Sequence, residues 1–457
     1  MRKVKSTIFT HQSLLTGGKG MSGVAVDTRE RWTSTDSWLF WSFGLGMLLE
    51  NYIFSLAPVA TGWVKVPKVL DQLMLSWAPI WLIIGIIIFG PIADRFGRKS
   101  TFYLTMALYA VGGIILIFAH TYVWILIALA LLLLASGGEM NTIMVASHEM
   151  MPRLHRSKTM MMELNFINLG AFLLGILAVI SSAWNSSETF QKSTVGVALI
   201  IVLFVLFLAR TRTPESIRWL MRQGRREQAE AEAIRYYGEE QGRIRLEPVQ
   251  KRIEQPSDSM LKKRVSLGLR FYVTLTTAFA GSAGFGLMTY TLAPNFFPKL
   301  TSTIILIAGA TGFFSGFFGL FGDRWSRKKL LLTGYLGTFI ITVLIYFTLG
   351  AWSKSLALFI ILLVILNVFV NIGYLTEDAL KGEVWPTHRR GTYTAIVRFV
   401  SIGLYIPTIY ISYAISLKGN MVMNIIIWAI GLTGALLWVA RGIETGKGVS
   451  IEEASLE

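Results

Sequence analysis

Six charged residues interrupt long apolar stretches of the sequence. They are Glu50, Glu139, Glu163, Glu377, Asp378 and Arg398. On insertion scales, a charged side chain at the centre of a membrane helix costs about 2.5–3.5 kcal/mol. Charges kept at that cost face a water-filled path or one another. These residues are therefore the first candidates for binding a solute or carrying a proton.

Glu50 is the strongest candidate for moving a proton, because it is expected near the middle of the first apolar stretch. Desolvation favours the neutral form of a buried carboxyl group. Such a group can take up and release a proton as access alternates between the two sides. We predict Glu50, and with it Glu139, as proton-coupling acids. The alternative is an acid held neutral by hydrogen bonds to neighbours such as Asn51.

Six polar side chains are predicted to contact the solute: Glu163, Asn165, Tyr290, Asn371, Glu377 and Arg398. Arg398 favours an anion, whereas the glutamates inside the spans favour a cation. An asparagine within a span serves as often in a helix–helix hydrogen bond. Lys381 lies close enough to a span end to extend to the membrane surface.

Glu163 and Arg398 are nearly equivalent in an internal repeat, so we expect them to face a cavity from opposite halves. The alternative is an ion pair of Arg398 with Glu163 or Glu377 that serves packing alone.

The elements that must position these residues are membrane spans. The sequence of 457 residues is 53% hydrophobic and only 15% charged, which no soluble domain could bury. We predict an all-α membrane protein with twelve spans. The predicted organisation is a tail (1–35), six spans (36–210), a polar linker (211–265), six further spans (266–441) and a second tail (442–457).

Three charged signatures occur twice. Asp94-Arg95-x-x-Arg98-Lys99 returns as Asp323-Arg324-x-x-Arg327-Lys328, and Glu149-x-x-Pro152-x-x-x-Arg156 returns as Glu383-x-x-Pro386-x-x-x-Arg390. Glu215-Ser216-x-Arg218 returns more loosely as Glu444-Thr445-x-Lys447. A repeat of this length sets the architecture, and it indicates two pseudo-symmetric halves of six spans each, as in one class of secondary transporters.

The basic residues indicate the orientation. Of 43 Lys and Arg, six lie in the loops opposite the termini: Lys65, Lys68, Lys192, Lys299, Lys354 and Lys418. This asymmetry predicts cytoplasmic termini in a multi-pass protein of the cell membrane. It explains the net charge of +16 by topology and contact with anionic lipid, not by binding of nucleic acid. The chain has no cysteine and no metal-ligand spacing, so we expect no metal and no cofactor.

Two stretches carry packing signals. Pro214 to Tyr237 is predicted to form one helix, either docked against the spans or solvated. In the eighth span, Gly309, Gly312, Gly316 and Gly319 recur at helical spacing, which predicts close contact with another helix.

The repeated loop Gly-x-x-x-Asp-Arg-x-x-Arg-Lys resembles the signature of the major facilitator superfamily. Within it, the chain resembles the branch of sugar porters and related organic-ion transporters, over about residues 36–453. The matching features are Pro214-Glu215-Ser216 with Gly224-Arg225, the two motifs at Glu149 and Glu383, and Ile443-Glu444-Thr445.

The resemblance implies a central cavity that opens alternately to each side, with a charged network at the cytoplasmic helix ends that holds the outward-facing state together. The predicted members are Asp94, Arg95, Arg98, Glu149, Arg156, Glu215, Arg218, Asp323, Arg324, Arg327, Glu383, Arg390 and Glu444. The alternative is that these residues only set topology and anchor loops.

The resemblance does not extend to the sugar-binding residues. The Gln-Gln-x-x-Gly-x-Asn pattern of sugar porters is absent from Thr276–Gly284, and Leu129 stands near the position of an arginine that proton-coupled sugar porters carry. We therefore predict a secondary transporter for a small polar organic solute, sugar-like or an organic acid, by proton symport. The alternatives are a transporter of organic cations or drugs by proton antiport, and a uniporter. We expect a monomer, and neither an enzyme nor a sensor.

Overall fold

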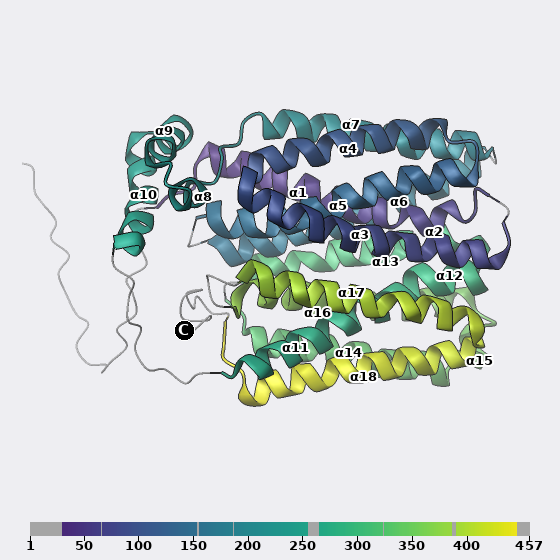
Figure 1. Cartoon of the computed structure of the whole chain (residues 1–457). Coiled ribbons are helices and arrows are strands. Elements are labelled where there is room, and N and C mark those ends of the chain that lie inside the picture. Colours follow the sequence, from purple (N-terminus) through teal and green to yellow (C-terminus); the bar gives the residue numbers. More distant parts are fainter. Residues whose placement is uncertain are drawn as a thin grey trace, which may run out of the picture.

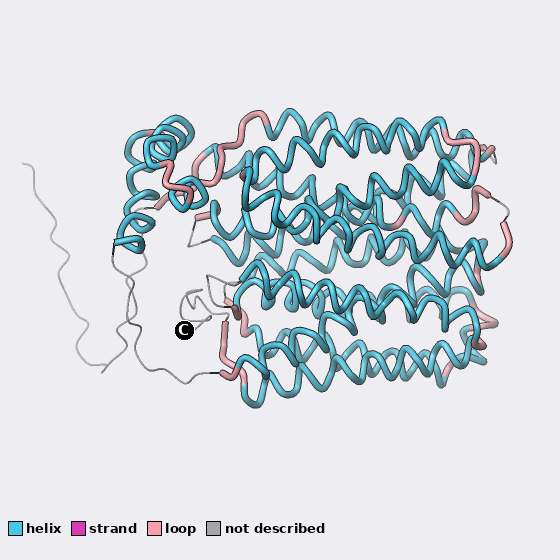
Figure 2. Tube along the Cα trace, in the orientation of Figure 1, coloured by secondary structure: helices cyan, strands magenta, loops and turns pink. Residues whose placement is uncertain are grey.

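The computed structural model describes residues 30–64, 66–152, 155–185, 187–254, 265–322, 324–385 and 390–445. Among these residues, twelve helical segments are long and apolar enough to cross a membrane, as predicted. Figure 1 shows them as a bundle of two layers, with the N-terminal half above the C-terminal half. Figure 2 shows that the connections gather at the two ends of the bundle.

The N-terminal half contains seven helices for six spans, because the first span is interrupted at Ser55. The helices are α1 (Ser34–Phe54), α2 (Leu56–Ala60), α3 (Lys68–Phe96), α4 (Arg98–Phe118), α5 (Tyr122–Met150), α6 (Arg156–Trp184) and α7 (Glu188–Arg210). At the start of α1, Thr33 and Asp36 form a reciprocal capping box. This cap fixes where the chain enters the bundle.

The C-terminal half repeats the arrangement, and its first span is interrupted by two π-helical turns. Its helices are α11 (Leu267–Phe279), α12 (Leu292–Phe296), α13 (Thr301–Ser315), α14 (Arg327–Phe347), α15 (Leu349–Trp352), α16 (Leu356–Glu383), α17 (Arg390–Ala414) and α18 (Leu417–Arg441). Between α11 and α12 the chain forms two π-helical turns, Ala280–Gly284 and Leu287–Thr291. Such turns in an α-helix frequently mark functional sites.

The two halves meet most closely where α6 packs on α13. A Cβ atom on Gly309 would collide with the backbone of Ala171 and Phe172, and one on Gly316 would collide with Asn165. The absence of a Cβ at Gly309, and at Gly316 directly after α13, therefore allows the two segments to touch. This confirms the close contact predicted from the glycine spacing.

The stretch predicted as one helix, Pro214–Tyr237, forms two, α8 (Ile217–Arg222) and α9 (Arg226–Tyr237), and α10 (Glu239–Glu254) follows them in the linker. The single-helix prediction is wrong because Gly224, at φ 74°, turns the chain between α8 and α9. Trp219 is buried, and its Nε1 donates to the carbonyl of Asp94 at 2.8 Å, so α8 is docked on the spans. We name the end of the bundle next to α8–α10 the linker face, and the opposite end the far face (Figure 1).

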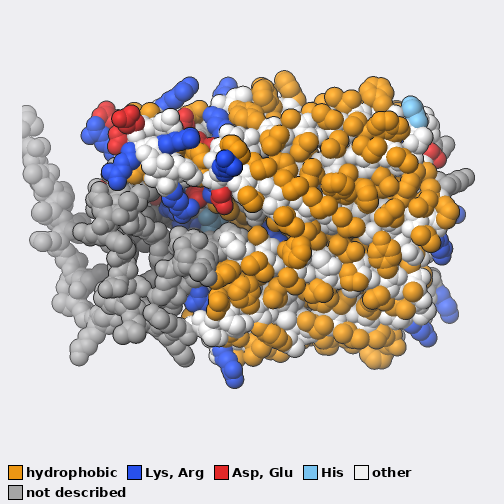
Figure 3. All heavy atoms as spheres, in the orientation of Figure 1, with side chains coloured by type: hydrophobic (Ala, Val, Ile, Leu, Met, Phe, Trp, Pro, Cys, Tyr) orange, Lys and Arg blue, Asp and Glu red, His pale blue; other side chains and the backbone are white. Residues whose placement is uncertain are grey.

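The surface agrees with a membrane protein. Figure 3 shows apolar side chains along the length of the bundle, whereas charged side chains gather at its two ends. Exposed apolar residues such as Ile201, Phe204 and Phe347 belong to this belt. A water-soluble protein does not expose an apolar surface of this extent.

Candidate functional site

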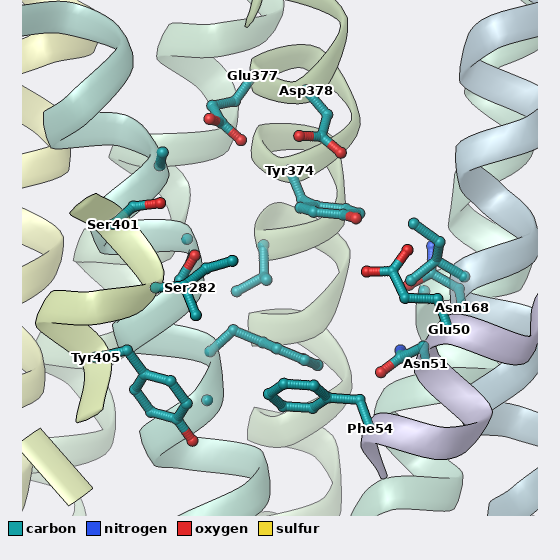
Figure 4. A pocket seen from close by; sticks show the side chains of 18 of the residues that line it. Glu50, Asn51, Phe54, Asn168, Ser282, Tyr374, Glu377, Asp378, Ser401 and Tyr405 are labelled. Atoms are coloured by element: carbon teal, nitrogen blue, oxygen red, sulfur yellow. The ribbon is translucent and has the colours of Figure 1, made fainter. Parts of the chain in front are cut away.

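A cavity of about 150 Å³ lies between the two halves, near the middle of the bundle. The N-terminal half contributes side chains of α1, α3, α5 and α6, and the C-terminal half those of α11, the π-helical turns, α13, α16 and α17. Figure 4 shows Glu50 and Asn51 pointing into this space from α1, opposite Ser282, Ser401 and Tyr405. A central position between two halves is where secondary transporters bind their solutes.

One end of the cavity is charged, and most of its charges are paired. On α16, Lys381 bridges Glu377 at 2.9 Å and Asp378 at 2.5 Å. On α17, Nη2 of Arg398 contacts both carboxylate oxygens of Asp378, at 3.3 and 3.4 Å. The expectation that Lys381 extends to the membrane surface is therefore wrong, because two buried carboxylates hold its ammonium group inside the bundle. Arg398 pairs with Asp378, not with Glu163 or Glu377.

Glu50 faces this charged end and forms no ion pair with the described residues. Its side chain is buried, and Oε2 has no hydrogen-bond partner among the described residues. Arg398, Asp378 and Lys381 are its charged neighbours. Nε and Nη1 of Arg398 likewise lack partners within the described part of the chain. An acid of one half and two free donors of the other half thus line the same small space.

The other end of the cavity is aromatic. The ring of Tyr290 lies 5.5 Å from that of Phe54 and 5.4 Å from that of Phe285, measured between centroids. Tyr290 also donates to Oδ1 of Asn51 at 2.8 Å and accepts from Ser55 at 3.0 Å. These contacts join the π-helical segment of the C-terminal half to α1, and so they close the cavity toward the far face.

The asparagines around the cavity serve mostly in helix–helix contacts. Asn168 donates to Asn371 at 2.7 Å, across the two halves, and Asn371 donates to the carbonyl of Gly312 at 2.8 Å. Asn367 donates to a carbonyl of its own helix at 2.7 Å. Asn165 does not line the cavity but binds the carbonyl of Phe313 at 3.0 Å. Few amide groups therefore remain for a solute.

Glu139 and Glu163 also lie away from the cavity. Glu139 is completely buried within the N-terminal half and forms an ion pair with Arg210 at the end of α7. Thr105 donates to the same carboxylate at 2.5 Å. Neither oxygen of Glu163 has a hydrogen-bond partner in the described ranges, and Ser147 is its polar neighbour. This placement does not support a solute contact for Glu163 or a proton-coupling role for Glu139, and both stay predictions.

We expect Arg210→Ala to destabilise the protein by about 3–5 kcal/mol, because it leaves the buried Glu139 carboxylate without its cation. Adding Glu139→Gln should recover most of that loss. Thermal unfolding of the purified variants in detergent, followed by tryptophan fluorescence, measures both effects. Equal stability of the single and the double variant would contradict this assignment.

Two charged networks at the linker face reproduce the sequence repeat in space. Nη1 and Nη2 of Arg98 bind the carbonyl of Ala93 at 2.7 Å and Glu149 at 3.2 Å. In the other half, the same atoms of Arg327 bind the carbonyl of Gly322 at 2.8 Å and Glu383 at 3.2 Å.

In each network a later carboxylate caps the helix that begins at the arginine. Glu215 accepts from the backbone N–H of Arg98 at 3.0 Å, and Glu444 accepts from that of Arg327 at 2.7 Å, with the same sequence separation of 117 residues. A negative charge in this position stabilises the N-terminus of a helix. Burial raises the pKa of Glu215, while the N–H groups of Ser216, Lys99 and Arg98 oppose the shift.

The remaining predicted gate residues are placed as follows: Asp94 binds Arg98 at 3.0 Å with an exposed side chain, Arg95 and Arg324 are exposed, Arg218 is half-buried, and Arg156 is buried. Asp323 lies outside the described residues, and Arg390 is placed only as the first residue of α17.

A larger hollow, the vestibule, lies between the halves at the linker face and measures about 860 Å³. Ile86, Met144, Arg218 and Ala395 are among the residues that line it. At the far face, by contrast, Tyr290 meets α1, and Ser76 of α3 meets Tyr410 of α17 at 2.8 Å. The halves are therefore joined at the far face. At the linker face the vestibule separates part of them, while Gly382 still packs against His148 and Nη1 of Arg327 lies 3.7 Å from Sδ of Met161.

Of the predicted solute contacts, the cavity includes Tyr290, Asn371, Glu377 and Arg398, together with Glu50. Asp378, a candidate from its charge within a span, also lines the cavity. The prediction missed Phe54, Ser282, Tyr374, Lys381 and Tyr405 as cavity residues. For Lys381 a signal was available, since it shares one turn of an apolar span with Glu377 and Asp378. The sequence does not show which aromatic side chains face the cavity, because most positions of the spans are apolar.

Comparisons with known proteins agree with this architecture. A family model described as Major Facilitator Superfamily matches residues 37–406. The glucose transporter GlcP of Staphylococcus epidermidis is 25% identical over 413 residues, which cover 85% of this chain and 88% of that protein. The arabinose-proton symporter of Bacillus subtilis is 23% identical over 407 residues, covering 82% and 85%.

Among solved structures, the proton:xylose symporter XylE of E. coli, bound to 6-bromo-6-deoxy-D-glucose, is similar with a TM-score of 0.72 at 18% identity. The match covers 92% of this chain and 98% of that one. This likeness shows the fold. All three relatives are transporters, in agreement with the prediction of a transport protein and not an enzyme.

Proposed function

The chain belongs to the major facilitator superfamily, and on this basis we propose that it carries a small polar organic solute together with protons by alternating access. The observation that carries the proposal is the cavity between the halves, where a buried acid of one half faces free donors of the other. A solute held there contacts both halves, so its binding influences how they move relative to one another. The solute is a sugar-like compound or an organic acid.

Glu50 is the proposed proton site. A carboxylate with an unbonded oxygen, buried at mid-membrane, is stabilised by taking up a proton. Its charged neighbours, Arg398, Asp378 and Lys381, belong to the opposite half. When the halves move relative to one another, the distances from Glu50 to these charges change, and with them the electrostatic potential at its carboxyl group. Protonation of Glu50 is thereby linked to the side on which the cavity opens. The arabinose and xylose symporters among the relatives support proton symport.

The runner-up is a transporter of organic cations or drugs by proton antiport. It is favoured by Glu50, Glu377 and Asp378 in the cavity wall. Two of these carboxylates are neutralised by Lys381 and Arg398, however, and the other acids of the spans lie elsewhere. The cavity of about 150 Å³ is also below the roughly 300–1,000 Å³ of pockets for drug-sized ligands. A proton-independent uniporter is the third possibility.

We propose that the linker face is cytoplasmic and that the protein is a monomer in the cell membrane, in contact with anionic lipid. The arginines of the repeated loops and of α8–α10 lie at this face, as the positive-inside rule requires of a cytoplasmic surface. The vestibule then lies on the cytoplasmic side of the cavity.

The networks around Arg98 and Arg327 are proposed to favour the outward-facing state. Since the chain has no cysteine, Ala395→Cys in the vestibule wall is a selective reporter of cytoplasmic access. In that background, Asp94→Asn should raise the labelling rate by a modest factor, up to about fivefold, because the Asp94 side chain is exposed. Glu239→Gln, which removes an exposed pair with Arg243 outside the networks, is the matched control. Unchanged labelling in Asp94→Asn would favour a role in topology alone.

The proposed function is tested with purified protein in liposomes. An inward proton gradient is imposed, and uptake of labelled xylose, glucose, benzoate and tetraethylammonium is followed with and without a protonophore. Accumulation of one compound that the protonophore abolishes, and that protein-free liposomes do not show, supports symport of that class. Accumulation only under an outward proton gradient would establish antiport, and equilibration that ignores protons would establish a uniporter.

A further inference from the structure

We propose that the solute is a small planar ring that carries one carboxylate, bound with its carboxylate on Arg398 and its ring among the aromatic residues of the cavity. This inference rests on the proposed transport function and deepens it by naming the substrate class.

The anionic group is indicated by the unused donors of Arg398. Its side chain is 2% exposed, yet only Nη2 has a partner, Asp378, while Nε and Nη1 have none among the described residues. Buried donors are almost always satisfied in native proteins. Arg398 lines the cavity, so a solute carboxylate placed there would supply the missing acceptors. Hydrogen bonds between a guanidinium and a carboxylate are among the strongest in proteins.

The charge balance of the cavity explains why such an anion would travel with a proton. Lys381 and Arg398 balance Glu377 and Asp378. The net charge of the cavity then depends on whether Glu50 is ionised. With Glu50 ionised, an added anion would make a second uncompensated negative charge in a desolvated space; with Glu50 protonated, it would be the only one. Anion binding therefore favours protonation of Glu50, and the two are carried together.

A sugar fits the same walls less well, because each of its hydroxyl groups needs a partner when it leaves water. The amide groups of Asn168 and Asn371 are bonded to each other and to α13. Oδ1 of Asn51 is bonded to Tyr290. These amide groups already have partners, so they offer few hydrogen bonds by which the site could select a solute with hydroxyl groups.

The ring is indicated by the opposite end of the cavity. Phe54, Phe285 and Tyr290 form one aromatic group there, and Figure 4 shows Phe54, Tyr374 and Tyr405 around the space into which Glu50 points. Aromatic side chains bind a planar ring by offset or edge-to-face contacts. The volume of about 150 Å³ limits the solute to a compound of this small size.

The test is binding to the wild-type protein in detergent, measured by calorimetry between pH 6 and 8. The probes are benzoate, benzamide (same ring, no charge), benzylamine (ring with a cation), acetate (charge without ring) and xylose. We expect benzoate to bind at least tenfold more tightly than each of the other four. Its affinity should rise as the pH falls, by up to tenfold per pH unit, because one proton binds with it. Glu50→Gln should remove this pH dependence.

Two pairs of variants locate the groups. Arg398→Gln should weaken benzoate binding at least tenfold, while Arg441→Gln, at the end of α18, should not change it. Phe54→Leu should weaken benzoate more than acetate, and Phe172→Leu, whose ring packs on Phe313 between α6 and α13, is the matched control. Thermal unfolding of each variant verifies that it is folded.

Tighter binding of xylose or of benzylamine than of benzoate would overturn the proposed class in favour of a sugar or a cation. Binding of benzamide as tight as that of benzoate would overturn the role of charge, and absence of binding by all probes would overturn the ring carboxylate. None of these results decides whether the protein is a proton-coupled transporter, which the liposome experiment tests separately.

Discussion

Replacing Glu50 with Gln should abolish accumulation of the solute under a proton gradient while leaving exchange of solute across the membrane. The amide resembles the protonated carboxyl in shape and charge, so the variant can still bind solute and alternate. It cannot release a proton, and the gradient no longer drives net transport. We expect accumulation to fall at least tenfold and exchange to stay within about twofold of the wild type, since the energetic coupling and not the solute contact is lost.

Glu188→Gln, at the exposed start of α7 on the far face, is the matched control for this experiment. It makes the same chemical change outside the cavity and should leave both activities intact. Uptake and exchange are measured in the same liposome preparation with labelled solute. Full accumulation by Glu50→Gln would show that the coupling proton binds elsewhere, and loss of exchange as well would make Glu50 a solute contact.

Substitution of Gly309 by Val should remove transport and most of the folded protein. The added Cβ would fall on the backbone of Ala171 and Phe172, where no side-chain rotation can relieve the overlap. Insertion of extra atoms into a packed interface costs about 1–3 kcal/mol and more where the backbone must move. The backbone of Ala171 and Phe172 is also part of the contact between the two halves, so a shift there disturbs how the halves pack.

Gly403→Val is the control, because a Cβ at Gly403 of α17 meets no atom within 4 Å. Both substitutions have the same effect on helix propensity, so a difference between them reports packing. Size-exclusion profiles in detergent and uptake in liposomes measure the two consequences. A Gly309→Val protein with a normal profile and normal uptake would contradict the close contact of α6 and α13.

The architecture was largely predictable from the sequence. Long apolar spans, glycines at helical spacing and a repeated loop are local patterns, and each has one simple structural solution. The spatial repeat of Arg98 with Glu149 and Glu215, and of Arg327 with Glu383 and Glu444, follows the sequence repeat directly.

Pairing of charges inside the bundle was harder to predict. Glu139 lies on α5, whose positions are apolar on every side, so the pattern does not show which way its carboxylate points. Its partner Arg210 is 71 residues away and ends another span. Lys381 is held inside by two acids of its own helix, although its position near the span end suggested the surface.

Breaks in the linker helix and in one span were also missed. Gly224 ends the first helix of the linker, and the two π-helical turns widen the span that contains Tyr290. The turn at Gly224 is local, because glycine adopts a positive φ readily. The π-helical turns have no comparable residue signal; the segment that contains them joins α1 of the other half through the hydrogen bond of Tyr290 to Asn51.

If solute and proton enter together, the proton itself can be followed as the solute crosses the membrane. Purified protein is reconstituted into liposomes with a pH-sensitive dye inside, and sugars, organic acids and organic cations are added outside with no imposed gradient. We expect one class of solute to acidify the lumen of liposomes that contain the wild-type protein, and we expect no acidification with Glu50→Gln. Entry of labelled solute without acidification would contradict proton symport, and alkalinisation of the lumen would show that protons leave as the solute enters.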